Sequence, residues 1–337
     1  MSGLVRKRVI ALIITVSVLL SSGIVSGCGF FVLENLEIIP ETPEVVIHEQ
    51  VVPLAQIDPA FVIPMPDAPG LLVESNNKAY VDYSNKHLGY VTVGFSEATD
   101  NMLRVLIITP GGNEYIYNLN PGIGDVFPLT SGNGSYTISV HEHYVDNIYK
   151  DILFVTIDVV LSDEFVPFTR PNKFVNYCNE SPVTAKAIEL RKESNSFLDM
   201  VDAVYSFVVE NISYDYELAD TVDFNYKPNL NTILENRSGI CFDIATLTAA
   251  MLRSQGIPSK LVFGYHYNQN TGHTYHAWVS VFSDEDGMIG NHTYFNGGTW
   301  NLLDPTLATM LGQSVPGING SVTSTSDGSV YHALYYY

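Results

Sequence analysis

The 337-residue sequence predicts an α+β domain that follows an all-β domain. Residues 78–165 contain short runs rich in Val, Ile, Tyr and Phe between Gly-, Pro- and Asn-rich turns, which is typical of antiparallel strands. Residues 166–337 begin with two helical patterns and a continuous apolar helix, and strand-like runs follow. This change of pattern near residue 165 places the boundary between the two domains.

The first 27 residues have the layout of an export signal. The basic residues 6–8 precede an apolar run at 9–20, which is short for a transmembrane helix, and small residues follow. The ending Val25-Ser26-Gly27-Cys28 resembles the bacterial lipobox. The resemblance implies a lipidated Cys28 and a lipoprotein anchored to the outer face of the cytoplasmic membrane at the cell surface. An uncleaved N-terminal anchor is the alternative.

Residues 28–77 are expected to form an extended spacer. Seven of the seventeen prolines lie here, and lysine and arginine are absent. Proline-rich chain is extended and semi-rigid, so it would hold the later domains away from a membrane. The apolar piece Phe61–Ile63 indicates that part of this segment docks as an edge strand.

The β domain is predicted at residues 78–165. Its β-rich runs lie at 79–83, 89–95, 103–108, 115–117, 135–140 and 152–157. About seven short strands with regular turns predict an immunoglobulin-like sandwich. His141 and His143 alternate along one run, so both side chains face one side. Two histidines on one face could supply two ligands of a metal site. The favoured interpretation is that they lie on an exposed strand face, because the sequence shows no further cluster of ligands.

Two helices open the α+β domain, at residues 181–184 onward and at 196–208. Ser181 followed by Pro182 is an N-terminal signal, and the second segment has apolar residues at helical spacing.

The segment Cys241–Leu252 is predicted to be a buried helix, because small and apolar residues occupy nearly every face. It ends at Gly256, two residues before Pro258. Cys241 then lies in the first turn, where free N–H groups and the helix dipole favour a thiolate and can also donate to an oxyanion. A plain buried cysteine is the alternative.

Two strand-like segments after the helix carry a histidine and an aspartate. His276 lies in the run 275–281, and Asp304 ends the run 300–304 before Pro305. A nucleophilic thiolate needs a base that moves a proton, and the base needs a carboxylate that orients it. The order Cys241, His276, Asp304 on a helix start and two strands fits that need.

These segments resemble the transglutaminase-like superfamily of papain-like thiol enzymes. Its motifs match Gly239-Ile240-Cys241, His276-Ala277-Trp278 and Leu303-Asp304-Pro305-Thr306, and the likeness covers roughly residues 170–310. It implies a papain-like α+β catalytic domain within 166–337. It also implies that Cys241 is the nucleophile, that His276 is the general base and acid, and that Asp304 orients His276.

Two aromatic residues are candidates for the cleft. Trp278 follows His276 by two, so on a strand both face the same side. It either shields the imidazole and lines the acyl pocket or is a core tryptophan. Tyr214 lies in a segment that resembles the family segment before the catalytic helix. A packing role for Tyr214 is favoured over a role in stabilising the oxyanion.

The net charge and the cysteine content limit the kinds of partner and cofactor that the protein is expected to bind. The net charge is −20, which argues against nucleic acid because phosphate binding needs a basic face. Three cysteines give no disulfide framework, and Cys178 is interpreted as incidental. No metal or organic cofactor is implied.

The expected function is acyl transfer on protein or peptide amides. A cysteine peptidase or amidase is favoured, because water needs no second binding site. A cross-linking transglutaminase and a non-catalytic surface lipoprotein that binds cell-wall or host polymers stay open.

Overall fold

The computed structural model describes residues 61–122, 124–223, 225–268, 272–290, 292–311, 322–324 and 330–337. All of these fall in one compact unit of contacts. The predicted signal peptide, Cys28 and residues 28–60 of the predicted spacer lie outside the described residues. Within the described ranges, no helix is both long and apolar enough to cross a membrane.

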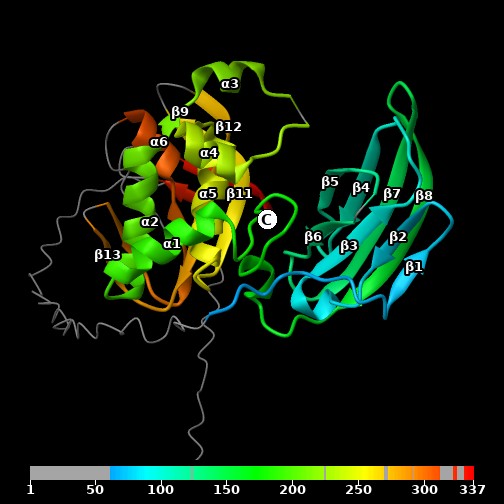
Figure 1. The fold of residues 1–337 in the computed structure, drawn as a ribbon, viewed down its shortest axis with the longest axis horizontal. Coiled ribbons are helices and arrows are strands. Elements are labelled where there is room, and N and C mark those ends of the chain that lie inside the picture. Colours follow the sequence, from blue (N-terminus) through cyan, green and yellow to red (C-terminus); the bar gives the residue numbers. More distant parts are fainter. Residues whose placement is uncertain are drawn as a thin grey trace, which may run out of the picture. The chain divides into compact units, whose positions relative to one another are not determined.

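Two four-stranded antiparallel sheets make up the N-terminal part (Figure 1). One sheet has the order β1-β2-β3-β6 and the other β5-β4-β7-β8. The strands are β1 (Val73–Ser75), β2 (Ala79–Asp82), β3 (Tyr90–Phe95), β4 (Leu103–Ile108), β5 (Glu114–Leu119), β6 (Asp125–Pro128), β7 (Gly134–Val145) and β8 (Ile148–Val159). A 3-10 turn, η2 (Lys86–Leu88), follows β2, and η3 (Val166–Phe168) follows β8.

Alternation along the strands explains how the two sheets pack. In β4, Leu103, Val105 and Ile107 are buried, and the residues between them are partly exposed. They share a core with Val91 and Val93 of β3, in the other sheet. The all-β prediction is confirmed and all six predicted runs are strands, whereas an immunoglobulin-like topology stays a prediction. The short β1 and β6 were not predicted.

The C-terminal end of the predicted spacer packs on the protein. Ile63 is 3% exposed and belongs to the core, but residues 61–63 do not form a strand, so the expected edge strand is wrong at this position. A Cβ at Gly256 would lie 3.1 Å from the ring of Phe61, so this ring lies against the end of the long buried helix. Any soluble fragment therefore needs to begin before Phe61.

The C-terminal part combines helices with a five-stranded antiparallel sheet of order β15-β12-β11-β17-β16. Its helices are α1 (Pro182–Glu193), α2 (Phe197–Asn211), α3 (Tyr216–Thr221), α4 (Leu230–Asn236), α5 (Cys241–Arg253) and α6 (Pro305–Leu311). Its strands are β9 (Ser213–Tyr214), β10 (Ser238–Gly239), β11 (Ser259–Asn268), β12 (Gly272–Ser283), β13 (Gly287–Ile289), β14 (Thr293–Phe295), β15 (Thr299–Leu303), β16 (Val322–Ser324) and β17 (Val330–Tyr336). The α+β prediction is confirmed.

Helix α5 is the centre of this part, as the sequence predicts. Every residue from Asp243 to Arg253 is buried. It packs on β11 and β12 and is contacted by α1, α2, α4 and α6 (Figure 1). Gly256 has φ +79°, a left-handed conformation that favours glycine at a helix end.

The sheet has two different faces because residues opposite each other on antiparallel strands point the same way. Leu261, Ala277, Val279 and Val281 join the core that contains α5. The opposite face carries a second small core made by Val262, Trp278, Leu302 and Tyr331. The aromatic C-terminal segment is a strand of this sheet, β17, paired with β11.

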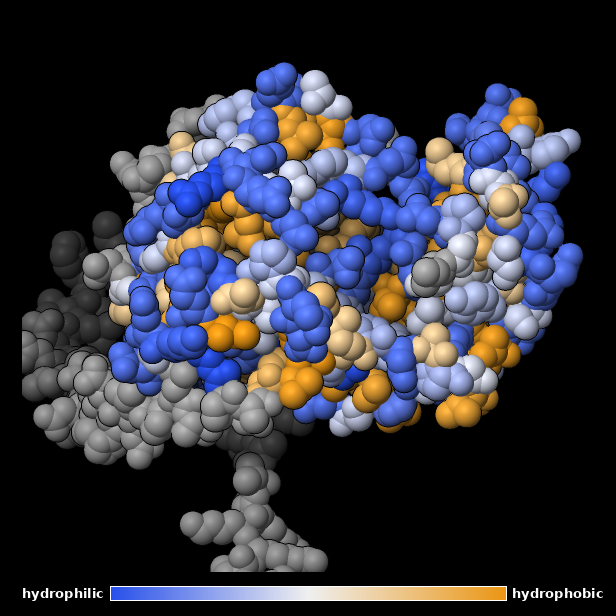
Figure 2. All heavy atoms as spheres, in the orientation of Figure 1, coloured by the Kyte–Doolittle hydropathy of each residue, from blue (hydrophilic) through white to orange (hydrophobic). Residues whose placement is uncertain are grey.

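On the face drawn in Figure 2, hydrophilic residues predominate and hydrophobic residues form separate small patches.

Candidate active site

Cys241 is the first residue of α5, and its neighbours fix that helix start. Asp243 Oδ2 accepts a hydrogen bond of 2.9 Å from the N–H of Ile240, and Tyr226 donates its hydroxyl to Asp243 Oδ1 at 2.7 Å. A Cβ at Gly239 would lie 2.5 Å from the Cβ of Asp243. Glycine at 239 is therefore required for Asp243 to reach across and cap the helix.

Tyr214 is brought beside this helix start by a short parallel ladder. Strand β9 pairs with β10, and Tyr214 is in register with Gly239, two residues before Cys241. Burial raises the pKa of Tyr214 to about 12, and the charge of Cys241 contributes in the same direction. The tyrosine is half-buried, so part of its side chain reaches solvent.

His276 joins Cys241 to Asp304. It lies on β12 opposite Gly264 of β11 and is 6% exposed. Its Nε2 is 2.8 Å from Asp304 Oδ2, and Cys241 lies close enough to contribute to the raised pKa of the imidazole. With Nε2 engaged by the carboxylate, Nδ1 is the ring nitrogen left for the sulfur. The structure thus brings together all three residues that the sequence analysis proposed.

Asp304 is held by four hydrogen bonds. Besides His276, Oδ2 accepts from the hydroxyl of Tyr331 at 2.8 Å, and Oδ1 accepts from the N–H groups of Thr306 at 3.0 Å and Leu307 at 3.2 Å. Asp304 therefore also caps α6. Burial tends to raise the pKa of its carboxyl, but His276, Tyr331 and the N–H of Leu307 together hold that pKa below the usual value.

The charge on His276 follows from these contacts. Burial lowers the pKa of the imidazole, but the charge and hydrogen bond of Asp304, aided by Cys241, outweigh burial and raise it to about 10. The ring is then an imidazolium at neutral pH. A cationic imidazolium is the partner that a thiolate needs.

Trp278 stacks beside the imidazole. The two ring centroids are 6.1 Å apart with an interplanar angle of 24°, and Trp278 is 3% exposed. A Cβ at Gly264 would lie 2.7 Å from Trp278 Cη2, so the glycine makes room for the indole. Trp278 thus belongs to the second small core and shields one side of His276.

Sequence reasoning missed Tyr331 and the pair Asp243 and Tyr226. The pattern of an acidic residue three positions after Ile240 was available as a helix-start signal. Tyr331 gave no comparable signal, because only the register of β17 beside β11 brings it to Asp304.

The remaining sequence candidates lie elsewhere. Cys178 and Cys241 are both free and partly exposed. His141 is hydrogen-bonded to Ser139 at 2.7 Å and to Asp151 at 3.0 Å, and His143 to the carbonyl of Asp146. Among the residues that the structure describes, no group of three or more His, Cys, Asp or Glu side chains is placed to hold a metal ion.

Comparison with known proteins identifies the domain. The family model of the transglutaminase-like superfamily matches residues 184–305. The uncharacterized protein YebA of Bacillus subtilis (strain 168) is 25% identical over 225 residues, which is 61% of this chain. The matched region is 29% of the length of YebA.

Among solved structures, the similarity is partial. A protein of Cytophaga hutchinsonii, provisionally named a cysteine protease, has a TM-score of 0.37 at 15% identity, over 78% of this chain and 73% of its own. The periplasmic domain of TgpA from Pseudomonas aeruginosa has a TM-score of 0.33 at 15% identity, over 71% of this chain and 99% of its own.

Proposed function

We propose that residues 184–305, a domain of the transglutaminase-like superfamily, catalyse acyl transfer from protein or peptide amides through Cys241, His276 and Asp304. The observation that supports this proposal is the position of His276, which is hydrogen-bonded to Asp304 and close enough to Cys241 for the two groups to act on each other electrostatically. A thiol nucleophile needs a base that moves its proton, and that base needs a carboxylate that orients it.

In the first step, Cys241 Sγ attacks the carbonyl carbon of the amide. The oxygen becomes negatively charged and accepts from the N–H of Cys241, because the first N–H groups of a helix have no acceptor within it. The C–N bond then breaks, and the proton on His276 passes to the departing amine. A thioester on Cys241 and an amine are the products.

In the second step, an acceptor attacks the thioester carbonyl and His276 removes its proton. The C–S bond breaks, and Cys241 and the imidazolium return. Asp304 keeps the imidazole oriented through both steps, and its fourfold hydrogen bonding holds that carboxylate in place. Hydrolysis results when the acceptor is water, which we favour because water needs no binding site of its own.

Transamidation is the second candidate, and one feature favours it. Helix α3 carries Tyr216, Glu217 and Asp220, and the charge of Asp220 acts on Tyr214 beside the thiol. Acidic and aromatic side chains attract a lysine ammonium. The acceptor that approaches the thioester past helix α3 would then be a primary amine.

The test uses a soluble protein that begins before Phe61. It is incubated with a glutamine-containing protein and a labelled primary amine, and mass spectrometry follows amine incorporation and new N-termini. Cys241→Ala should abolish both products, and Cys178→Ala is the matched control that should keep them. Incorporation indicates a transglutaminase, and new N-termini indicate a peptidase. Neither product, with unreactive Cys241, would favour a non-catalytic lipoprotein that binds polymers.

We further propose that the protein is a bacterial surface lipoprotein anchored through Cys28. The support is the signal-like sequence of residues 1–27 and its lipobox-like ending. Cys28→Ala in the full chain should prevent incorporation of labelled fatty acid. Unchanged labelling would contradict the anchor.

A further inference from the structure

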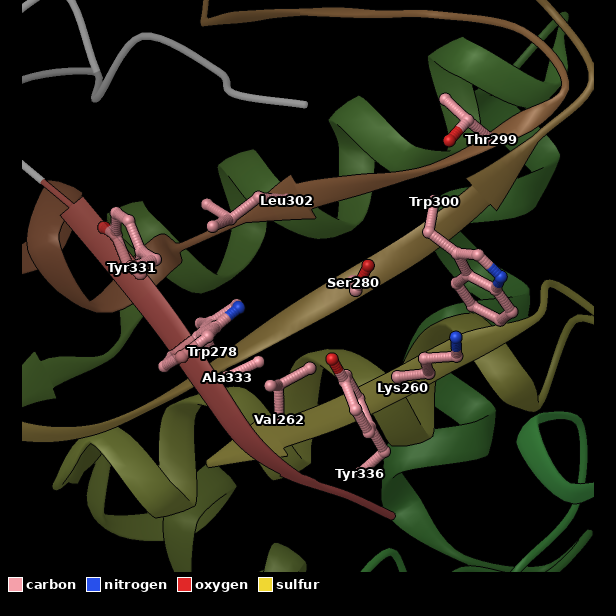
Figure 3. Close-up of a pocket in the computed structure, with 10 residues that line it drawn as sticks. All are labelled: Lys260, Val262, Trp278, Ser280, Thr299, Trp300, Leu302, Tyr331, Ala333 and Tyr336. Carbon is pink, nitrogen blue, oxygen red and sulfur yellow. The ribbon is translucent and has the colours of Figure 1, made fainter. Parts of the chain in front are cut away.

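A cavity of about 220 Å³ lies on the sheet face that carries Trp278, opposite to the face that packs on α5. Side chains from four strands line it: β11, β12, β15 and β17 (Figure 3). Cys241, His276 and Asp304 are not among its lining residues. It is therefore a separate site, but two of its lining residues also contact the candidate active site: Trp278 stacks with His276, and Tyr331 donates to Asp304.

Lys260 is the one charged residue among the lining residues. Its Nζ lies 3.7 Å from the ring centroid of Trp300, 4.9 Å from that of Phe168 and 5.2 Å from that of Tyr336. No carboxylate in the described part of the chain lies within ion-pair distance of it. Burial lowers the pKa of Lys260 to about 8, against a smaller opposite effect of Glu164. The cavity thus contains a largely desolvated ammonium with no carboxylate at ion-pair distance.

The rest of the cavity is divided into a polar and an apolar zone. Ser280 is directly opposite Lys260 in the β11–β12 register, so its hydroxyl is on the same face as the ammonium. Val262, Leu302 and the indole of Trp278 form the apolar zone beside them (Figure 3). The volume is below that of typical drug-sized pockets, so it suits a ligand with one amino-acid-sized apolar group.

We propose that this cavity binds a small carboxylate with an apolar body, with the carboxylate at Lys260 and Ser280 and the body against Val262, Leu302 and Trp278. A bound carboxylate would form the close ion pair that Lys260 does not make within the described chain, and it would accept a hydrogen bond from the serine hydroxyl. In a chain with a net charge of −20, a cationic pocket is an unusual place where a small anion gains rather than loses electrostatic energy.

The chain provides its own probe of this site. It contains two tryptophans, Trp278 and Trp300, and both line the cavity. Selectively excited tryptophan emission therefore reports on the cavity. We would titrate the full-length Cys241→Ala protein with N-acetyl-leucine, N-acetyl-phenylalanine and N-acetyl-alanine, and with the matched neutral amides. Because this variant lacks the proposed nucleophile, the result is independent of the proposed function.

The expected result is a saturable change in emission with at least one acid. The corresponding amide should bind roughly 10- to 100-fold more weakly, since it lacks a charge-assisted contact. Lys260→Met should lose a similar factor, and Ser280→Ala should lose about 2- to 10-fold. Lys186→Met, at a partly exposed position of α1 that does not line the cavity, is the control that should bind as the parent does.

Equal binding of acid and amide, or unchanged affinity in both Lys260→Met and Ser280→Ala, would overturn the proposal. No saturable response to any of the three acids would overturn it as well. Ser280→Ala keeps the test valid if Lys260→Met fails to fold.

Discussion

Removing the hydroxyl of Tyr331 tests the link between the C-terminal strand and the candidate active site. Tyr331 is 1% exposed and donates to Asp304 Oδ2 at 2.8 Å. In Tyr331→Phe the ring keeps its place against Trp278, at 5.1 Å between centroids, so no large cavity forms. The loss is one buried hydrogen bond to a charged acceptor, which amounts to roughly 1.5–3 kcal/mol.

A second effect of Tyr331→Phe concerns charge. The hydrogen bond from Tyr331 lowers the pKa of Asp304, so that pKa should rise in the variant. The carboxylate then protonates at a higher pH, and the acidic limb of activity should move upward.

Urea unfolding followed by tryptophan emission measures the stability loss. Tyr294→Phe is the control, because Tyr294 is 50% exposed on β14 and should change stability little. Equal stability of Tyr331→Phe and the parent protein, with an unmoved acidic limb, would refute the reasoning.

Three further predictions follow from the same geometry. Asp304→Asn should lower turnover by about 10⁴-fold, the effect of losing an orienting carboxylate, and kcat measured beside a folded control checks it. The pKa of His276 is raised from 6.5 to about 10, so its protonation stabilises the fold below pH 6.5 and this contribution is lost as pH rises through about 10. The free energy of unfolding should therefore fall between pH 6.5 and about 10, by at most about 1.4 kcal/mol per pH unit. Urea titrations at several pH values measure this slope. The absence of a slope would show that the imidazole of His276 is neutral. Gly264→Ala should destabilise the protein and alter the emission of Trp278, because a Cβ there would clash with a backbone carbonyl and the indole, whereas Gly111→Ala, in open space, should be neutral in melting experiments.

The parts of the fold that local pattern determines were predictable. The run of small and apolar residues after Cys241 predicted a buried helix, and Gly256 with Pro258 predicted its end. The β-rich runs carrying His276 and ending at Asp304 are strands β12 and β15. These features depend on residue type and spacing within one segment, so the sequence alone contains them.

Features that depend on distant segments were not predictable. Tyr331 reaches Asp304 because β17 pairs with β11, a register that neither segment specifies alone. Tyr214 lies beside Gly239 through a two-residue parallel ladder. Helix α3 was not predicted, since its six residues are too few to show a helical pattern.

The most direct test of the central claim compares the two free thiols of the described chain. Cys178 and Cys241 are both partly exposed, so Cys178 is an internal control for access. Brief iodoacetamide treatment at mildly acidic pH, followed by mass spectrometry of each peptide, measures their relative rates. The account predicts that Cys241 is labelled much faster than Cys178 and that Asp304→Asn reduces this difference. Equal labelling of the two cysteines, in the parent protein and the variant, would contradict a nucleophilic Cys241.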